Sequence, residues 1–245
     1  MKRTIDLNSD MGEGFGVWEM GNDFALLDYI DSTNIACGWH AGDPERMKSL
    51  VRAAIEKNVL IGAHPSLPDL VGFGRREMAI TPNDAYNFVL YQAGALQAFV
   101  HAQGGVLHHV KPHGAFYSQA AKDLNLARAI AQAVKDLGKE VILYGLASSC
   151  FVKAAQEVGV PLWQEVFADR RYTPQGYLVP RNQANALIQN EDEAAEQALR
   201  MAKAGEVIAL DGSIVKVHAD TLCIHGDSPS ALDFVKKIKP LLQLH

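Results

Sequence analysis

The chain has 245 residues, of which 48% are hydrophobic and 21% charged, and its 23 Lys and Arg against 28 Asp and Glu leave a net charge of −5. This composition supplies a sizeable core and excludes a disordered or fibrous protein. No long basic run follows a nucleic-acid backbone, and no apolar run approaches the roughly 18–20 residues of a membrane-spanning helix. Met1 to Asp6 leads into an acid rather than the apolar stretch of a signal peptide. We therefore expect a cytoplasmic protein that binds neither nucleic acid nor membrane.

The cysteines give a second compositional indication. There are three, Cys37, Cys150 and Cys223, an odd number without the paired spacing of metal ligands. This pattern argues against a disulfide framework and against a zinc finger, and favours reduced thiols.

The first half of the chain alternates apolar segments with amphipathic ones. The apolar segments predict strands at residues 4–8, 34–37, 59–63 and 106–110. Asp43-Pro44 pairs a helix N-cap with proline at the first helical position, and predicts a helix that ends near Asn58. Thr81-Pro82 repeats this signal for a helix that ends at Gly104-Gly105, after a loop rich in Pro and Gly over residues 65–80.

The second half continues this alternation. It predicts helices over 123–137, 149–158, 191–204 and 228–242, the last capped by Ser228-Pro229, and strands at 141–144 and 161–167. A polar loop occupies residues 169–189, and residues 207–225 predict two or three short strands.

Strands that alternate with amphipathic helices predict an α/β protein built from βαβ units around a largely parallel sheet. About seven such units in a chain of this length favour a (β/α) barrel over two small domains. No linker, low-complexity tract or internal repeat divides the chain, so we expect one domain over residues 1–245.

In barrels of this type the functional groups project from the carboxyl ends of the strands and from the loops that follow them. Six predicted strand ends carry polar side chains that would meet on one rim. They are Asp6, Asn8, Asp10 and Glu13; Asn34, Cys37, His40 and Asp43; His64 and Asp69; Lys111 and His113; Glu165, Asp169 and Arg170; and His225 and Asp227.

Several of these residues also have a purely structural interpretation. Asp6 can serve to satisfy backbone donors between strands, and Asp43 and Asp227 suit helix caps. Cys37 is either a nucleophile near His40 or, as we favour, a small buried thiol.

A carboxylate and two imidazoles on three strand ends match an open metal site with two histidines and one carboxylate. Asp10, His40 and His64 form such a set, although none lies in a helical H-E-x-x-H pattern. The alternative is a hydrogen-bonded acid–base cluster without a metal. His108 and His109 alternate along a strand, so that only one faces inward, and we assign neither to the site.

The usual nucleotide and serine-hydrolase motifs are missing from the sequence. There is no G-x-x-x-x-G-K-[ST] phosphate loop, no dinucleotide fingerprint and no G-x-S-x-G elbow. A nucleotide would have to be held by glycine turns and by the basic side chains Arg75, Arg76, Lys111, Arg170 and Arg181.

Seven segments, in order along essentially the whole chain, resemble the LamB/YcsF family. They are DLNSDMGE (6–13), NIACGWHAGDP (34–44), GAHPS (62–66), GFGRR (72–76), KPHG (111–114), EVFADR (165–170) and HGD (225–227).

The resemblance implies a distorted seven-stranded (β/α) barrel like those of glycoside hydrolases and deacetylases. It also implies cleavage of 5-oxoproline (pyroglutamate) to L-glutamate with hydrolysis of ATP to ADP and phosphate, in a complex with two partners, the B and C subunits of 5-oxoprolinase. Related deacetylase-like barrels hold a metal with an Asp and two His. A divalent metal would therefore be either Mg²⁺ with ATP or an ion at Asp10, His40 and His64.

This reaction suits the polar residues of the rim. A lactam resists attack by water, and phosphorylation of its oxygen would make the ring carbon a better electrophile. We expect the general base and acid to come from Asp10, His40, His64 and His113. We expect substrate binding by Asn8, Glu13, Lys111, Glu165, Asp169, Arg170 and His225. Within that set, Lys111 and Arg170 would hold anionic oxygens, and Glu165 or Asp169 would bind the substrate nitrogen or orient a histidine.

Two other functions remain open from the sequence. One is a stand-alone, metal-dependent amide or acyl hydrolase of the deacetylase type. The other is a non-catalytic subunit that binds a small molecule and presents it to its partners.

Overall fold

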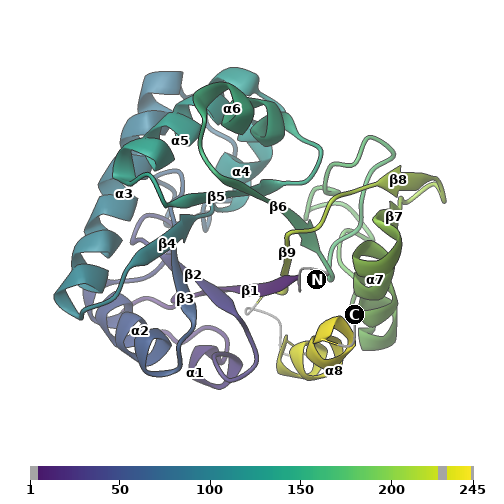
Figure 1. The fold of residues 1–245 in the computed structure, drawn as a ribbon, viewed down its shortest axis with the longest axis horizontal. Helices are drawn as coiled ribbons and strands as arrows, with labels where there is room; N and C mark the ends of the chain where they lie inside the picture. The colour runs from purple at the N-terminus through teal and green to yellow at the C-terminus, as the bar shows by residue number, and fades with distance from the viewer. Residues whose placement is uncertain (1–4, 226–230, 244–245) are drawn as a thin grey trace.

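Seven parallel strands close into a barrel at the centre of the computed structural model, which describes residues 5–225 and 231–243 (Figure 1). The strands follow one another around the barrel in chain order, and the last one pairs with the first. They are β1 (Asp6–Met11), β2 (Ser32–Ala36), β3 (Leu60–His64), β4 (Leu107–Val110), β5 (Ile142–Leu146), β6 (Leu162–Phe167) and β9 (Thr221–Cys223). The seven-stranded (β/α) barrel predicted from the sequence is confirmed.

Helices cover the barrel from outside (Figure 1). The predicted ones are α2 (Pro44–Glu56), α3 (Pro82–Ala102), α5 (Leu124–Leu137), α6 (Cys150–Val158), α7 (Glu191–Ala204) and α8 (Ala231–Gln243). The Asp43 carboxylate accepts hydrogen bonds from the backbone N–H groups of Glu45 and Arg46, and Thr81 forms a capping box with Asp84. Asp227 and Ser228-Pro229, the expected caps of α8, lie outside the described residues. Within the part of the chain that the structure describes, no helix is long and apolar enough to span a membrane.

The prediction missed two short helices, α1 (Asp23–Leu26) and α4 (Gly114–Ala120). Neither has a side-chain cap at its N-terminus, and neither is long enough to show a helical repeat of apolar residues. The short strands predicted over residues 207–225 do not all belong to the same sheet. The strands β7 (Glu206–Ile208) and β8 (Ile214–Lys216) form a separate antiparallel pair beside α7, and only β9 enters the barrel, between β6 and β1.

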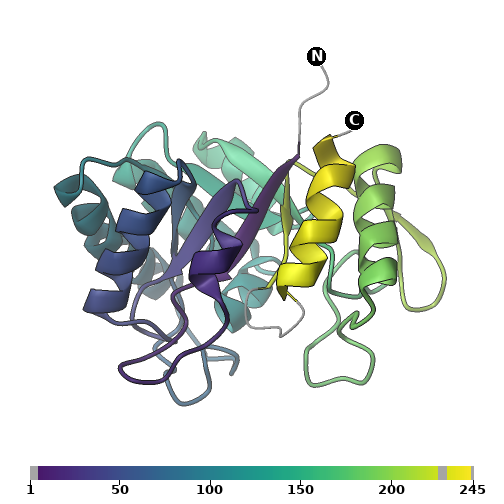
Figure 2. The ribbon, with the colours of Figure 1, turned by 90° about the horizontal axis from the view of Figure 1, so that it is seen from below.

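Long loops gather at one end of the barrel, opposite the end at which β1 begins. Figure 2 shows the loops that follow β1, β3 and β6 at this end. Asp6, which the sequence placed on the functional rim, lies at the start of β1 and therefore at the other end. Its Oδ2 accepts hydrogen bonds from Ser32 Oγ at 2.8 Å and Thr221 Oγ1 at 2.5 Å, and burial raises the pKa of the Asp6 carboxyl to about 6.

Polar side chains, rather than aliphatic ones, fill the middle of the barrel. Nε2 of His109 lies 2.7 Å from Oδ1 of Asn34, and the His109 ring stacks on Tyr144 with centroids 3.9 Å apart. A Cβ at position 62 would lie 2.0 Å from Nε2 of His109, which explains the glycine in the third strand. Of the two alternating histidines on β4, His109 is thus the one that faces inward.

Candidate active site

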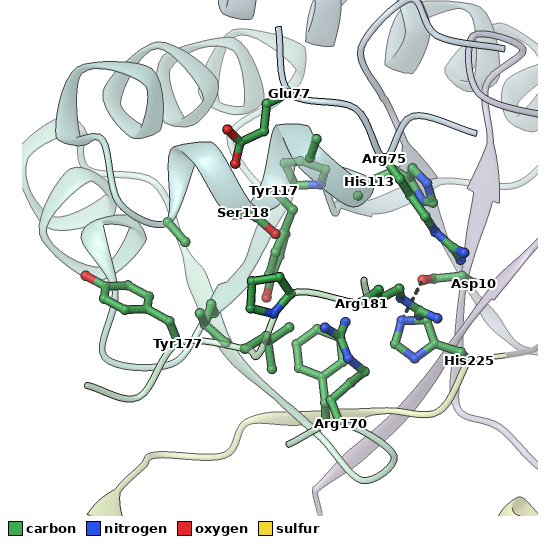
Figure 3. A pocket seen from close by; sticks show the side chains of 18 of the residues that line it. Asp10, Arg75, Glu77, His113, Tyr117, Ser118, Arg170, Tyr177, Arg181 and His225 are labelled. Carbon is green, nitrogen blue, oxygen red and sulfur yellow. Dashed lines mark ion pairs between the residues drawn. The ribbon is translucent and has the colours of Figure 1, made fainter. Parts of the chain in front are cut away.

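A cavity of about 940 Å³ opens among the loops at the carboxyl ends of the strands (Figure 3). Its wall is formed by side chains from six of the strand ends and from the long loops. The ionisable or hydroxyl-bearing ones include Asp10, Glu13, His64, Arg75, Lys111, His113, Tyr117, Arg170, Arg181 and His225. The structure therefore places seven of the expected site residues around one cavity. They are Asp10, Glu13, His64, Lys111, His113, Arg170 and His225.

On one side of the cavity a carboxylate faces three imidazoles. Oε1 of Glu13 lies 3.1 Å from Nε2 of His40, 3.3 Å from Nδ1 of His113 and 4.0 Å from Nε2 of His64. The rings of His40 and His113 stack with centroids 3.7 Å apart. All four side chains are buried, and their ligand atoms lie within 4.8 Å of one another, so that they could hold a metal ion. We call Glu13, His40, His64 and His113 the histidine–glutamate cluster.

The cluster differs from the carboxylate and two histidines expected from the sequence. Asp10 lies between Lys111 and His64, and its Oδ1 forms an ion pair with Nζ of Lys111 at 2.8 Å. Its other oxygen lies 3.3 Å from Nε2 of His64. Glu13, expected to bind substrate, is the carboxylate that contacts His40 and His113, while Asp10 contacts His64.

The backbone fixes the orientation of two of the three rings. Nδ1 of His64 donates to the carbonyl oxygen of Lys111 at 2.7 Å, and Nε2 of His113 donates to that of Phe73 at 2.9 Å. A carbonyl can only accept, so each of these nitrogens carries the ring proton. Burial lowers the pKa values of His40 and His113, which favours neutral rings.

Lys111 lies at the bottom of the cavity and is held by the protein on several sides. Its Nζ lies 2.8 Å from Asp10 Oδ1, 2.8 Å from Glu165 Oε1 and 3.1 Å from Cys223 Sγ. Burial disfavours the charged ammonium, but the neighbouring carboxylates of Asp10 and Glu165 hold the pKa of Lys111 well above its ordinary value. Since these contacts use its donors, Lys111 does not fit the expected role of holding anionic oxygens of a substrate.

Asn8 and Glu165 lie deeper than expected, inside the barrel beneath Lys111. Both are fully buried, and neither lines the cavity. Nδ2 of Asn8 donates to Glu165 Oε1 at 3.0 Å, and the hydroxyl of Tyr117 donates to Glu165 Oε2 at 2.7 Å. The two residues therefore support Lys111 from within the barrel, and their expected contact with a substrate stays a prediction.

Next to Asp10, His225 forms a hydrogen-bonded pair with Asp169. Oδ2 of Asp169 lies 2.8 Å from Nδ1 of His225, and the same carboxylate oxygen accepts from the His225 backbone N–H at 3.2 Å. Burial opposes ionisation of Asp169, but the charge and hydrogen bond of His225 lower the pKa of the carboxyl to about 2. Nε2 of His225 lies 4.0 Å from Asp10 Oδ2 (Figure 3). Of the two roles expected for Asp169, its contacts fit the orientation of a histidine.

Arginines form a positively charged part of the wall beside this pair. Figure 3 shows Arg75, Arg170 and Arg181 near Asp10 and His225. Nη2 of Arg170 donates to the carbonyl of Val179 at 2.6 Å, which fixes the guanidinium. Its Nε is buried and has no hydrogen-bond partner in the described part of the chain. Burial lowers the pKa of Arg170 to about 10, so the side chain remains charged at neutral pH.

Two residues near the cavity were not predicted, and two predicted ones have structural roles. Tyr117 was missed because it lies on α4, which gave no helix signal, and Cys223 because its contact with Lys111 arises only when the barrel closes. Cys37 is the buried thiol that we favoured, and burial raises its pKa to about 12. The Asp69 carboxylate pairs with Arg76 and holds the loop after β3.

Comparisons with known proteins agree over nearly the whole chain. The model of the LamB/YcsF family matches residues 5–245. A Bordetella pertussis protein, named as the A subunit of 5-oxoprolinase, is 54% identical over 243 residues, which cover 99% of this chain and 96% of that protein. A Bacillus cytotoxicus protein of the same name is 49% identical over 242 residues, covering 99% of this chain and 96% of the relative. The crystal structure of a lactam utilization protein from Thermus thermophilus superimposes with a TM-score of 0.91 at 45% identity, covering 98% of this chain and 96% of that one.

Proposed function

The chain belongs to the LamB/YcsF family, and on this premise we propose that it is the A subunit of an ATP-dependent 5-oxoprolinase, which opens 5-oxoproline to L-glutamate. The 54% identity with a protein that bears this name, over nearly the full length of both chains, carries this proposal. An A subunit implies further subunits, which we take to be the B and C subunits of the enzyme. ATP as co-substrate, with Mg²⁺, and a cytoplasmic location belong to the same proposal.

The cavity suits a small anionic lactam. Its volume of about 940 Å³ lies near the top of the roughly 300–1,000 Å³ range of small-molecule sites, and leaves room for a phosphoryl group on the ring oxygen. Arg170 and its neighbour Arg181 would pair with the substrate carboxylate or with phosphate oxygens, because a guanidinium matches both in a bidentate geometry.

His225 is the residue we assign to proton transfer. Asp169 holds the proton on Nδ1, which leaves the lone pair of Nε2 directed at the cavity. Nε2 would take a proton from water as the water oxygen bonds to the ring carbon. The same imidazolium would then give this proton to the ring nitrogen as the C–N bond breaks, and a second water would release phosphate from the resulting acyl phosphate to give glutamate. The neighbouring carboxylate of Asp10 would stabilise the imidazolium, which departs from the sequence-based view that His225 only binds substrate.

The test is an assay of glutamate formation from 5-oxoproline by the chain alone, by the chain with the B and C subunits, and by the full complex without ATP. We expect glutamate only from the complete, ATP-supplied mixture, and its loss with His225→Gln. Glutamate made at the full rate by the chain alone would overturn the complex. Full activity of the complex with His225→Gln would overturn the assignment of the base.

The histidine–glutamate cluster favours a second candidate function, a stand-alone metal-dependent amide hydrolase. It would hydrolyse its substrate without ATP or partners and lose activity to a chelator. A non-catalytic binding subunit would differ from both, because substitutions at the cavity would change substrate affinity but leave turnover at saturation unchanged.

A further inference from the structure

The four polar side chains of the histidine–glutamate cluster are buried together on one part of the cavity wall. Three imidazoles and one carboxylate supply four acceptor atoms, and each side chain is at least 93% buried, the exposed fractions being 7% for Glu13, 1% for His40 and His64, and 5% for His113. The ammonium of Lys111, which lines the same cavity, is engaged by Asp10 and Glu165. An anionic group buried in this way needs a compensating charge.

The positions of the ring protons make this need more specific. His64 and His113 each use their one ring proton on a backbone carbonyl, those of Lys111 and Phe73 respectively. Their other nitrogens, Nε2 of His64 and Nδ1 of His113, lie 3.0 Å apart. These two nitrogens make no hydrogen bond to a backbone carbonyl, and their separation would let one metal ion contact both rings.

The distances between the acceptor atoms fit a metal ion of ordinary size. A tetrahedral Zn²⁺ with bonds of about 2.1 Å separates its ligand atoms by roughly 3.4 Å. The contacts within the cluster are 3.0 Å between His64 and His113, and 3.1, 3.3 and 4.0 Å from Glu13 to His40, His113 and His64. These values bracket the expected separation.

The surroundings also resemble a built metal site. The hydrogen bonds from His64 and His113 to backbone carbonyls are those that commonly orient metal-bound imidazoles. The ring of Phe73 packs edge-on against both His40 and His113, at 5.4 and 5.3 Å between centroids. At Gly74, a Cβ would lie 2.8 Å from the His113 ring and 2.9 Å from His40 Cβ, so the loop closes tightly over the cluster.

We infer that Glu13, His40, His64 and His113 bind one divalent transition-metal ion of the Zn²⁺ or Co²⁺ type. Imidazole and carboxylate ligands suit these ions better than Mg²⁺ or Ca²⁺, which prefer oxygen ligands alone. The ion would tie together the loops that follow β1, β2 and β4 and the end of β3. This inference does not depend on the oxoprolinase reaction.

The test is metal binding by the purified full-length chain after dialysis against a chelator. Co²⁺ titration followed by visible absorption, and Zn²⁺ titration by calorimetry, should each give one ion per chain, and Zn²⁺ should displace the Co²⁺ spectrum. Glu13→Gln and His113→Gln should each weaken metal binding by at least about 100-fold. Loss of a residue that only hydrogen-bonds to a metal ligand already costs about 10- to 100-fold, and loss of a ligand itself should cost more. Circular dichroism and thermal unfolding of each variant without metal would show that it is folded.

His225→Ala is the matched control, because Asp10, Cys223 and His225 form the second group of closely spaced ligand atoms in the described residues. Co²⁺ binding should survive this substitution unchanged. The inference is overturned if the chain binds neither ion, if the folded Glu13→Gln and His113→Gln variants bind as tightly as the parent, or if only His225→Ala abolishes binding. The readouts contain no 5-oxoproline, so their failure leaves the proposed function standing, and the reverse also holds.

Discussion

Oδ2 of Asp169 lies 2.8 Å from Nδ1 of His225, although 56 residues separate the two in the sequence. The pairing of β6 with β9 explains this contact. Phe167 is the register partner of Cys223, so the residues two positions further along each strand direction also lie side by side. The strand register of the barrel therefore positions the pair that we assign to proton transfer.

Asp169→Asn tests this relationship. The amide cannot stabilise an imidazolium, and its NH₂ group can turn the ring to the wrong tautomer, so we expect kcat of the assembled complex to fall by about 100-fold or more. KM should change little, because Asp169 does not line the cavity. Steady-state kinetics on both parameters measure this split. The exposed Asp136→Asn serves as control, and an unchanged kcat for Asp169→Asn would contradict the role.

Arg170→Ala should weaken substrate binding more than turnover. Removal of one charged hydrogen-bonding partner costs about 1.5–3 kcal/mol, which corresponds to a rise in KM of roughly 10- to 100-fold. Arg52→Ala, on the outer face of α2, provides a control for the loss of one arginine. A fall in kcat with unchanged KM would show instead that Arg170 acts only in the transition state.

Lys111→Met should destabilise the fold strongly. It would leave Asp10 and Glu165 buried without their shared cation, and breaking a buried ion pair in this way costs about 3–5 kcal/mol. Urea unfolding measures the loss, and Lys153→Met on the surface should stay within about 0.5 kcal/mol of the parent. Adding Glu165→Gln should recover part of the loss. A double variant less stable than Lys111→Met alone would contradict this account.

Asp6 predicts a pH dependence of stability that a variant can isolate. Its pKa rises from 3.8 to about 6 on folding, so the folded state binds the proton more tightly and gains stability below about pH 4. This contribution is lost as the pH rises through about 6, and the shift of about two units corresponds to roughly 3 kcal/mol. Asp6→Asn cannot ionise, so its stability relative to the parent should increase by up to this amount between pH 4 and pH 7.5.

Urea unfolding of the parent and of Asp6→Asn across this range gives the difference directly. Asp23, whose pKa is also raised to about 6, contributes equally to both proteins and cancels. The surface variant Asp136→Asn should run parallel to the parent. A parallel curve for Asp6→Asn would show that the Asp6 carboxyl is not held protonated by burial.

Most of the barrel was predictable because its signals are local. Asp43-Pro44 and Thr81-Pro82 begin helices through contacts with the next three residues, and those contacts need no tertiary structure. The pairing of β7 with β8 outside the barrel was not predictable. Both strands have the same short apolar pattern as β9, and only the closure of the barrel between β6 and β1 selects Thr221–Cys223.

The site was predictable as a set of residues but not in its pairings. Asp10 contacts His64 and Glu13 contacts His40, on either side of a turn at Gly12 whose left-handed φ of 74° redirects the chain. The engagement of Lys111 by Asp10 and Glu165 joins residues from three separate strands, and no local pattern reports such a contact. The sequence therefore indicated which residues lie at the carboxyl ends of the strands. The contacts that each of them makes depend on side-chain directions that only the folded structure shows.

The late position of β9 in the chain has a consequence for the order of folding. Until Thr221–Cys223 is in place, β1 and β6 each present an unpaired edge, and such edges promote association between chains. During synthesis the first six strands therefore form at most an open sheet until β9 has been made. We expect nascent chains that lack β9 to depend on chaperones and to aggregate when released.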